Sequence, residues 1–119
     1  MVAVFILIVL GGLGVVMITV FGGQQRSAAY DALGTRAYQA ARAGIEVGTV
    51  LAIGGACGAN NFAIAPFTVS VQCVATIHFE GTTQVTVFQI TSTACTANPC
   101  PGAAGPNYIE RQMRATVTP

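Results

Sequence analysis

The N-terminal part of this chain is one continuous apolar run, and no charged residue precedes Arg26. Residues 1–21 read MVAVFILIVLGGLGVVMITVF. As a helix this run would be about 31 Å long, which matches the hydrocarbon core of a bilayer. An apolar surface of this size does not stay in water as a monomer. The run must therefore enter a membrane, be cleaved off, or pack against other copies of the chain.

Three interpretations of the run stay open. The simplest is a single-pass anchor. A secretory signal fits less well, because such signals carry a basic leading region and a shorter apolar stretch. The third is a helix that is stored in a membrane and later packs with its copies. Small residues let helices approach closely, and this modestly favours the third interpretation. The glycines in or beside the run are Gly11, Gly12, Gly14, Gly22 and Gly23.

Composition narrows the function classes. With 119 residues, the chain has room for one domain. Charged residues make up 8% of it and the net charge is +1, so it lacks the basic field that nucleic-acid binding needs. The arginines are also too dispersed to form a polybasic membrane patch. We predict no nucleic-acid partner.

Four cysteines predict two disulfides and an oxidising compartment: Cys57, Cys73, Cys95 and Cys100. A zinc site is disfavoured because there is no paired CxxC and His78 is the only histidine. No metal or cofactor is expected. We favour sequential pairing, Cys57 with Cys73 and Cys95 with Cys100, although the sequence leaves all three pairings open.

Residues 27–53 predict an amphipathic helix that continues the apolar one, since they are rich in alanine and lack proline. Gly54-Gly55 is expected to end it. At a period of 3.6, the outer face would carry Arg36, Gln39, Arg42 and Glu46. The core-facing side would carry Tyr30, Leu33, Gly34, Ala37, Tyr38, Ala41, Ile45, Gly48 and Ala52.

The period changes to 2 after Pro66, which predicts strands. The first begins with FTVSVQC and continues to a turn at Glu80-Gly81. The second covers 83–94, where a slip at Val87-Phe88 predicts a bulge or burial on both faces. The last covers 108–118, with Arg111 interrupting its apolar face. The predicted fold is α+β, with an apolar helix at 1–26 and a globular domain at 27–119. In that domain, helix 27–53 covers a small antiparallel sheet within 66–119.

Catalytic chemistry is not indicated. His78 falls on the outward phase of a strand, and Glu80 and Glu110 each sit near a turn or a strand end. The sequence contains no GxSxG, HExxH or Walker motif. We predict that the chain is not an enzyme, and that Tyr30 and Tyr38 serve packing.

The architecture resembles type IV pilins and pseudopilins, and the segments resemble one family more closely. GTRAYQAARAGIEVG (34–48) is similar to the helix signature of the MSHA (mannose-sensitive haemagglutinin) pilus biogenesis protein P family. The resemblance covers nearly the whole chain. Four further segments agree with that family: IVLGGLG (8–14), FTVSVQC (67–73), ITSTAC (90–95) and YIERQMRATV (108–117).

The resemblance implies a prepilin-like protein of a diderm bacterial envelope. It would be trimmed by a prepilin peptidase, stored in the inner membrane and moved by the pilus assembly machinery into an extracellular pilus. Its partners would be copies of itself or related pilins. Arg36, Arg42 and Glu46 would then contact adjoining subunits. The apolar residues expected at helix contacts between subunits are Phe5, Ile8, Leu13, Val16 and Val20.

One departure from the pilin pattern bears on the role. Pilins typically carry a glutamate at the fifth mature position, whereas Phe5 stands fifth here and no acid precedes Asp31. Alignment on IVLGGLG puts Met1 about three residues inside the expected mature end. Either further residues precede Met1 in the mature chain, or Met1 itself follows the cleavage site and is the processed N-terminus. Neither case restores the glutamate. The missing carboxylate fits a minor or tip subunit. A repeating subunit, a minor pilin and a single-pass membrane protein with a periplasmic domain stay open.

Overall fold

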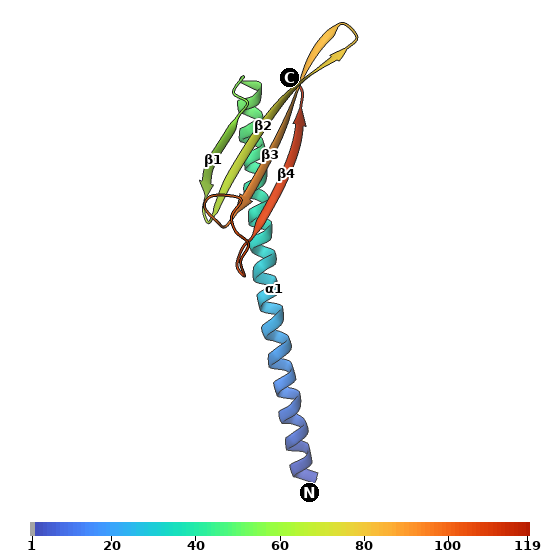
Figure 1. Ribbon diagram of the computed structural model, residues 1–119. Coiled ribbons are helices and arrows are strands. Elements are labelled where there is room, and N and C mark those ends of the chain that lie inside the picture. The colour runs from blue at the N-terminus through green and yellow to red at the C-terminus, as the bar shows by residue number, and fades with distance from the viewer. Residues whose placement is uncertain (1) are drawn as a thin grey trace. The chain divides into compact units, whose positions relative to one another are not determined.

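The computed structural model describes residues 2–119, which fold into one helix and four strands. The helix is α1 (Val2–Ile53). The strands form one antiparallel sheet in chain order, β1-β2-β3-β4 (Figure 1). By its internal contacts the chain forms two compact units, which divide between Leu33 and Gly34. The strands are β1 (Ala59–Ile64), β2 (Phe67–Glu80), β3 (Thr83–Cys95) and β4 (Glu110–Val117).

The helix ends where the glycine pair predicts. Gly55 has a φ of +85°, a left-handed conformation that residues with a Cβ rarely adopt. The Ala56 N–H donates to the Leu51 carbonyl at 2.8 Å, and the Gly55 N–H donates to the Ala52 carbonyl at 3.1 Å. These two bonds form the usual glycine C-cap and satisfy carbonyls that the last helical turn leaves open. The predicted end of the helix is confirmed.

Within the second unit, every buried residue of the C-terminal part of α1 is glycine or alanine. A Cβ on Gly48 would lie 2.7 Å from Ile90 Cγ2 and 2.9 Å from Val71 Cγ1. A Cβ on Gly44 would lie 2.8 Å from Val69 Cγ1. Because real Cβ contacts are longer, the backbones approach as closely as glycine allows. The buried helix residues are Gly34, Ala37, Ala40, Ala41, Gly44, Gly48 and Ala52.

The predicted core face of this helix was wrong at its two aromatic positions. Tyr30 and Tyr38 are 47% and 48% exposed, whereas Ala40 and Gly44, which the prediction omitted, are buried. For Tyr38 the close approach explains the difference, because a tyrosine does not fit between the two backbones, whereas Tyr30 belongs to the first unit. One helical position is a rotation of about 100°, so Tyr38 turns away while Ala37 and Ala41 face the sheet.

The sheet begins earlier in the chain than predicted. The segment at 59–64 lies outside the predicted sheet at 66–119. It forms edge strand β1 and pairs with the first half of β2, from Ile64↔Phe67 to Ala59↔Gln72. Its sequence ANNFAI has only a weak alternation, and the two asparagines are typical of turns. Pairing with β2 therefore determines this strand more than its own pattern does.

The central hairpin, β2–β3, turns at Gly81, which has a φ of +66°. Its pairing is continuous from Thr68↔Cys95 to Glu80↔Thr83. The predicted bulge at Val87-Phe88 was therefore wrong. The alternative, partial burial on both faces, is observed: residues 85–88 are all half-buried. The last strand was predicted within two residues of its observed bounds.

Candidate functional site

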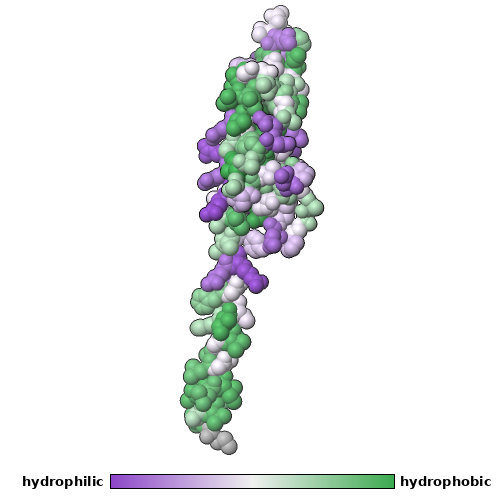
Figure 2. All heavy atoms as spheres, turned by 90° about the vertical axis from the view of Figure 1, so that its left-hand side faces the viewer, coloured by the Kyte–Doolittle hydropathy of each residue, from purple (hydrophilic) through white to green (hydrophobic). Residues whose placement is uncertain are grey.

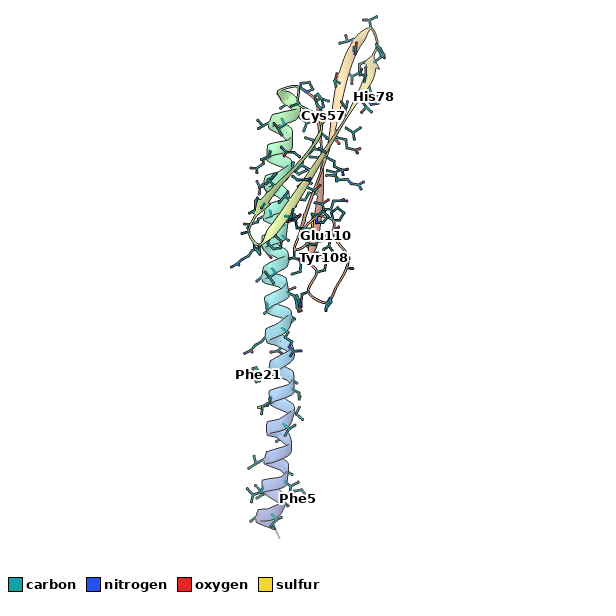
Figure 3. All side chains as sticks on the ribbon, turned by 60° about the vertical axis from the view of Figure 1, so that its left-hand side comes forward. Phe5, Phe21, Cys57, His78, Tyr108 and Glu110 are labelled. Carbon is teal, nitrogen blue, oxygen red and sulfur yellow. A yellow bond between two sulfur atoms is a disulfide. The ribbon has the colours of Figure 1, made fainter. Side chains whose placement is uncertain are left out.

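The largest unpartnered surface lies on the first unit, and we call residues 2–21 the apolar segment. Its large hydrophobic side chains are between 44% and 75% exposed. Figure 2 shows hydrophobic side chains covering this part of the helix, with hydrophilic ones next to it along the chain. In Figure 3, Phe5 and Phe21 extend away from the helix without a neighbour. The segment thus presents a surface that its own chain leaves uncovered.

Beyond the first helical turn, the polar groups of the apolar segment are satisfied within the helix. Its backbone is helical throughout, and the Thr19 hydroxyl donates to the Val16 carbonyl at 2.8 Å. Thr19 is the only residue with a polar side chain among residues 2–21. Helical hydrogen bonding is what lets a backbone enter a water-free environment. In length and composition the helix is sufficient to cross a membrane, and it is compatible with a membrane anchor or a signal sequence.

The glycines of the apolar segment contrast with those at the sheet. A Cβ added to Gly11, Gly12 or Gly14 would meet nothing within 4 Å, and the same holds for Gly22 and Gly23. Each glycine disfavours a helix by about 1 kcal/mol relative to alanine. At Gly48, close packing against the sheet compensates for this cost. At these five glycines, nothing in the described residues does so. A compensating contact would have to come from outside the chain.

The residues predicted at subunit contacts are all exposed, and so are the side chains around them. They are Phe5, Ile8, Leu13, Val16 and Val20. Because the whole circumference of the segment is apolar, the structure does not single out this set. Met1, the candidate processed N-terminus, lies outside the described residues.

Two disulfides hold the second unit. Cys57–Cys73 fastens the loop after the helix to β2, and the Cys73 N–H donates to the Gly58 carbonyl at 3.1 Å. Cys95–Cys100 closes the start of the loop that follows β3. This is the sequential pairing that the sequence analysis favours, and each described cysteine is in one of the two bonds.

A polar tie that the sequence analysis missed closes the same loop onto β4. The Tyr108 hydroxyl donates to the Glu110 carboxylate and accepts a hydrogen bond from the Gly102 N–H at 3.1 Å (Figure 3). The hydrogen bond to Glu110 raises the pKa of Tyr108 above its usual 10.0. The sequence signal for this hydrogen bond is the two-residue spacing of Tyr108 and Glu110, because residues two apart in an extended chain point the same way.

The structure does not bring Glu80 and Glu110 together. Glu80 pairs with Thr83 beside the β2–β3 turn, whereas Glu110 pairs with Cys95 at the opposite end of β3. His78 is exposed near the turn, opposite Val85 (Figure 3). Within residues 2–119, no group of three or more His, Cys, Asp or Glu side chains could hold a metal ion.

The charged face of the helix carries a weak ion pair. Arg42 Nε lies 3.4 Å from Glu46 Oε1, and both side chains are largely exposed. An exposed pair with the base first contributes only tenths of a kcal/mol. The pair is therefore available for contacts with another molecule.

Comparison with known proteins identifies no relative: no family model, no curated protein and no solved structure matches this chain. The fold and site define a class by their own geometry. This is an α+β protein in which one N-terminal apolar helix continues onto a small four-stranded antiparallel sheet stabilised by two disulfides.

Proposed function

We propose that this chain has a type IV pilin-like fold and is a structural subunit of a type IV pilus or pilus-like extracellular filament. It polymerises through the apolar segment. The observation that carries the proposal is the exposure of every large hydrophobic side chain of that segment, on a helix that continues into a folded, disulfide-linked domain. Copies packed helix against helix would cover this surface and leave the sheets outside.

The energetics define the mechanism of assembly. Removing apolar surface from water contributes about 25 cal/mol per Å². Moving it from lipid into a bundle of similar helices contributes little, because lipid tails are as apolar as the helices. The inner membrane therefore stores the subunit, and extraction requires work from an assembly machine. The pilus machinery that the resemblance implies would supply that work.

The glycines of the apolar segment support helix-to-helix packing. Gly11, Gly12 and Gly14 lie within about one helical turn, and nothing in the chain fills the space beside them. Small residues allow neighbouring helices to approach closely. Packing with a sister helix would give these residues a role that the single chain does not.

The disulfides support a location outside the cytoplasm, where oxidising conditions maintain such bonds. In the proposed pathway the chain is made with a basic leader, trimmed by a prepilin peptidase and held in the bacterial inner membrane. It then becomes part of an extracellular pilus, with copies of itself or related pilins as partners.

A second candidate is a minor pilin or pseudopilin that primes or caps assembly. The absence of an acidic residue before Asp31 favours it, since a subunit without the usual glutamate has no carboxylate to pair with the N-terminal amine of a neighbour. A third candidate is a single-pass membrane protein with a periplasmic domain, which the membrane-compatible helix would also serve.

Counting copies separates these candidates. Filaments are sheared from cells that make the chain, and its copy number per length of filament is measured against a known amount of the same chain. A repeating subunit gives many copies spread along each filament. A few copies per filament would point to the minor pilin. Recovery of the chain only in the membrane fraction, with none in sheared material, would contradict both filament roles.

A further inference from the structure

The β2–β3 hairpin continues beyond the part of the sheet that the helix covers. Gly44 lies against Val69 and Gly48 lies against Val71, so four residues of the helix cover the same length as two residues of the strand. Each step is about 6–7 Å. From Gly48, α1 continues for only about 7.5 Å to Ile53, whereas β2 continues for about 30 Å from Val71 to Glu80. Figure 1 shows this hairpin extending past the end of the helix.

Residues 74–89, which we call the distal hairpin, therefore expose a face that would otherwise be core. Ile77 and Phe79 alternate in phase with Val69 and Val71 along β2, so they lie on the same sheet face. Val69 and Val71 are buried under the helix, whereas Ile77 is 58% exposed and Phe79 is 72% exposed. On β2 this face stays apolar after its cover has ended, whereas the residues opposite Ile77 and Phe79 on β3 are Thr86 and Gln84.

A second apolar feature lies on the helix itself. A hollow of about 300 Å³ is lined by Glu46, Val47, Val50 and Leu51, and we call it the helix hollow. Its surface is almost entirely apolar, and Val50 is 72% exposed. Each copy of the chain thus carries a projecting apolar edge and an apolar hollow.

We propose that the distal hairpin of one copy places Ile77 and Phe79 in the helix hollow of a neighbouring copy. The proposal rests on the proposed function, which brings copies side by side. Charge favours a second copy as the occupant. Glu80 adjoins Phe79. Arg42 does not line the hollow but lies 3.4 Å from Glu46, which does, so its guanidinium offsets that carboxylate where Glu80 would approach. A guanidinium has five N–H donors, so Arg42 can also bind the Glu80 of a neighbour.

The two halves of this contact are different surfaces, which makes it heterologous. A contact of this kind uses the hairpin of one copy and the hollow of the next, so each copy joins two neighbours. Repeated without closure, it generates an open filament rather than a closed dimer. The globular parts would then link subunits in the same filament that the apolar segments hold together.

Disulfide trapping tests the contact directly. The full-length chain is made with both Phe79→Cys and Val50→Cys, and filaments are oxidised and run on a non-reducing gel. We expect a ladder of multimers that reductant collapses to one band. The matched control pairs Val50→Cys with His78→Cys, which is adjacent in β2 but on the opposite face. Its multimer yield should be at least about tenfold lower.

The possible failures are distinguishable. Chains carrying Ile8→Cys and Val16→Cys report separately on packing of the apolar segments. If these crosslink while Val50–Phe79 does not, the hairpin contact is wrong and the filament stands. If neither crosslinks, the proposed function fails as well. Val50–Phe79 bands that stop at a dimer, or that contain only other proteins, would also overturn the contact.

A charge reversal provides an independent test that leaves the core untouched, since Glu80 and Arg42 are exposed. Glu80→Arg should lower the Val50–Phe79 crosslink yield several-fold, because it places two cations together. Adding Arg42→Glu should restore the yield. Equal crosslink yields in the Val50→Cys/Phe79→Cys chain, in the chain with Glu80→Arg and in the chain with both charge changes would contradict the assigned orientation of the contact.

Discussion

At Gly48 the helix approaches the sheet so closely that a single methyl group does not fit. The two nearest atoms, Ile90 Cγ2 and Val71 Cγ1, belong to branched side chains that are themselves buried. Branched side chains in a packed core have few alternative rotamers. The position is therefore fixed by packing, although glycine is a poor helix former.

Gly48→Ala should destabilise the second unit. Alanine would improve helix propensity by about 1 kcal/mol, but overpacking a closed core costs about 1–3 kcal/mol. We expect a net loss of about 1 kcal/mol in the free energy of unfolding, measured by urea denaturation of the full chain in mild detergent. The control is Gly58→Ala, where the added Cβ meets nothing within 4 Å. A midpoint for Gly48→Ala equal to that of the control would show that the close approach is absent.

Ser92→Ala should stabilise the same unit. Ser92 is fully buried against the helix, and its hydroxyl has no hydrogen-bond partner among residues 2–119. An unsatisfied buried hydroxyl costs about 1–3 kcal/mol, and alanine removes it without leaving a sizeable cavity. We expect a gain of about 1 kcal/mol in the same measurement. Ser70→Ala, on the outward-facing phase of β2, serves as control and should change little. A lower midpoint for Ser92→Ala would reveal a hidden partner for the hydroxyl.

The residue scale is also where prediction from sequence failed most clearly. Hydrophobicity ranks tyrosine as a core residue, so Tyr30 and Tyr38 were assigned to the buried face. The observed face is set by size instead, because only Gly and Ala fit between α1 and the sheet. Sequence periodicity identifies a helix and its approximate faces, but the distance between packed elements decides which neighbouring position is buried.

At the scale of elements, the Cys57–Cys73 bond is the main covalent link between the helical and β parts of the second unit. It spans 16 residues, whereas Cys95–Cys100 spans 5. Loop-closure entropy then gives stabilisations of about 3 and about 2 kcal/mol. Cys57→Ser/Cys73→Ser should therefore lower the unfolding midpoint more than Cys95→Ser/Cys100→Ser. Helicity of the apolar segment in detergent should not change in either. Midpoints unaffected by reductant would contradict this role of the disulfides.

The loop between β3 and β4 should make stability depend on alkaline pH. The hydrogen bond to Glu110 raises the pKa of Tyr108 in the folded state above its unfolded value of 10.0. A raised pKa means that the folded state binds this proton more tightly. Its stabilisation is therefore complete below pH 10 and is lost as the pH rises through the folded pKa.

Unfolding midpoints measured from about pH 8 to about pH 11 test this dependence. The wild type should lose stability over the upper part of that range. The Tyr108→Phe variant has no phenol to titrate. Its unfolding midpoint should therefore be lower than that of the wild type at the start of the range and should fall less as the pH rises. Parallel curves for the two proteins would mean that the Tyr108 bond does not contribute.

Element types were largely predictable, since the 3.6-residue and 2-residue periods gave α1, β2, β3 and β4. The exceptions have tertiary causes. β1 forms because β2 offers it a partner, and the expected bulge in β3 is absent because the hairpin pairs continuously and partly buries both faces at 85–88. The tie between Tyr108 and Glu110 depends on a loop conformation that no periodicity encodes.

At the scale of the whole molecule, the dominant fact is an uncovered apolar surface on residues 2–21. Beyond the first turn its polar groups are satisfied within the helix, so this part of the segment is suited to lipid and to the interior of a protein bundle alike. The sequence predicted this surface, and the resemblance implied copies of the chain or related pilins as its partners. What covers the surface decides whether the molecule is an anchor or a filament subunit.

Electron cryo-microscopy of filaments sheared from cells that make the chain tests this account most directly. The account predicts that the apolar segments of neighbouring copies lie against one another at the filament axis, with the sheets at the outside. It would be contradicted if the chain were recovered only as a detergent-bound monomer whose apolar segment contacts no other protein.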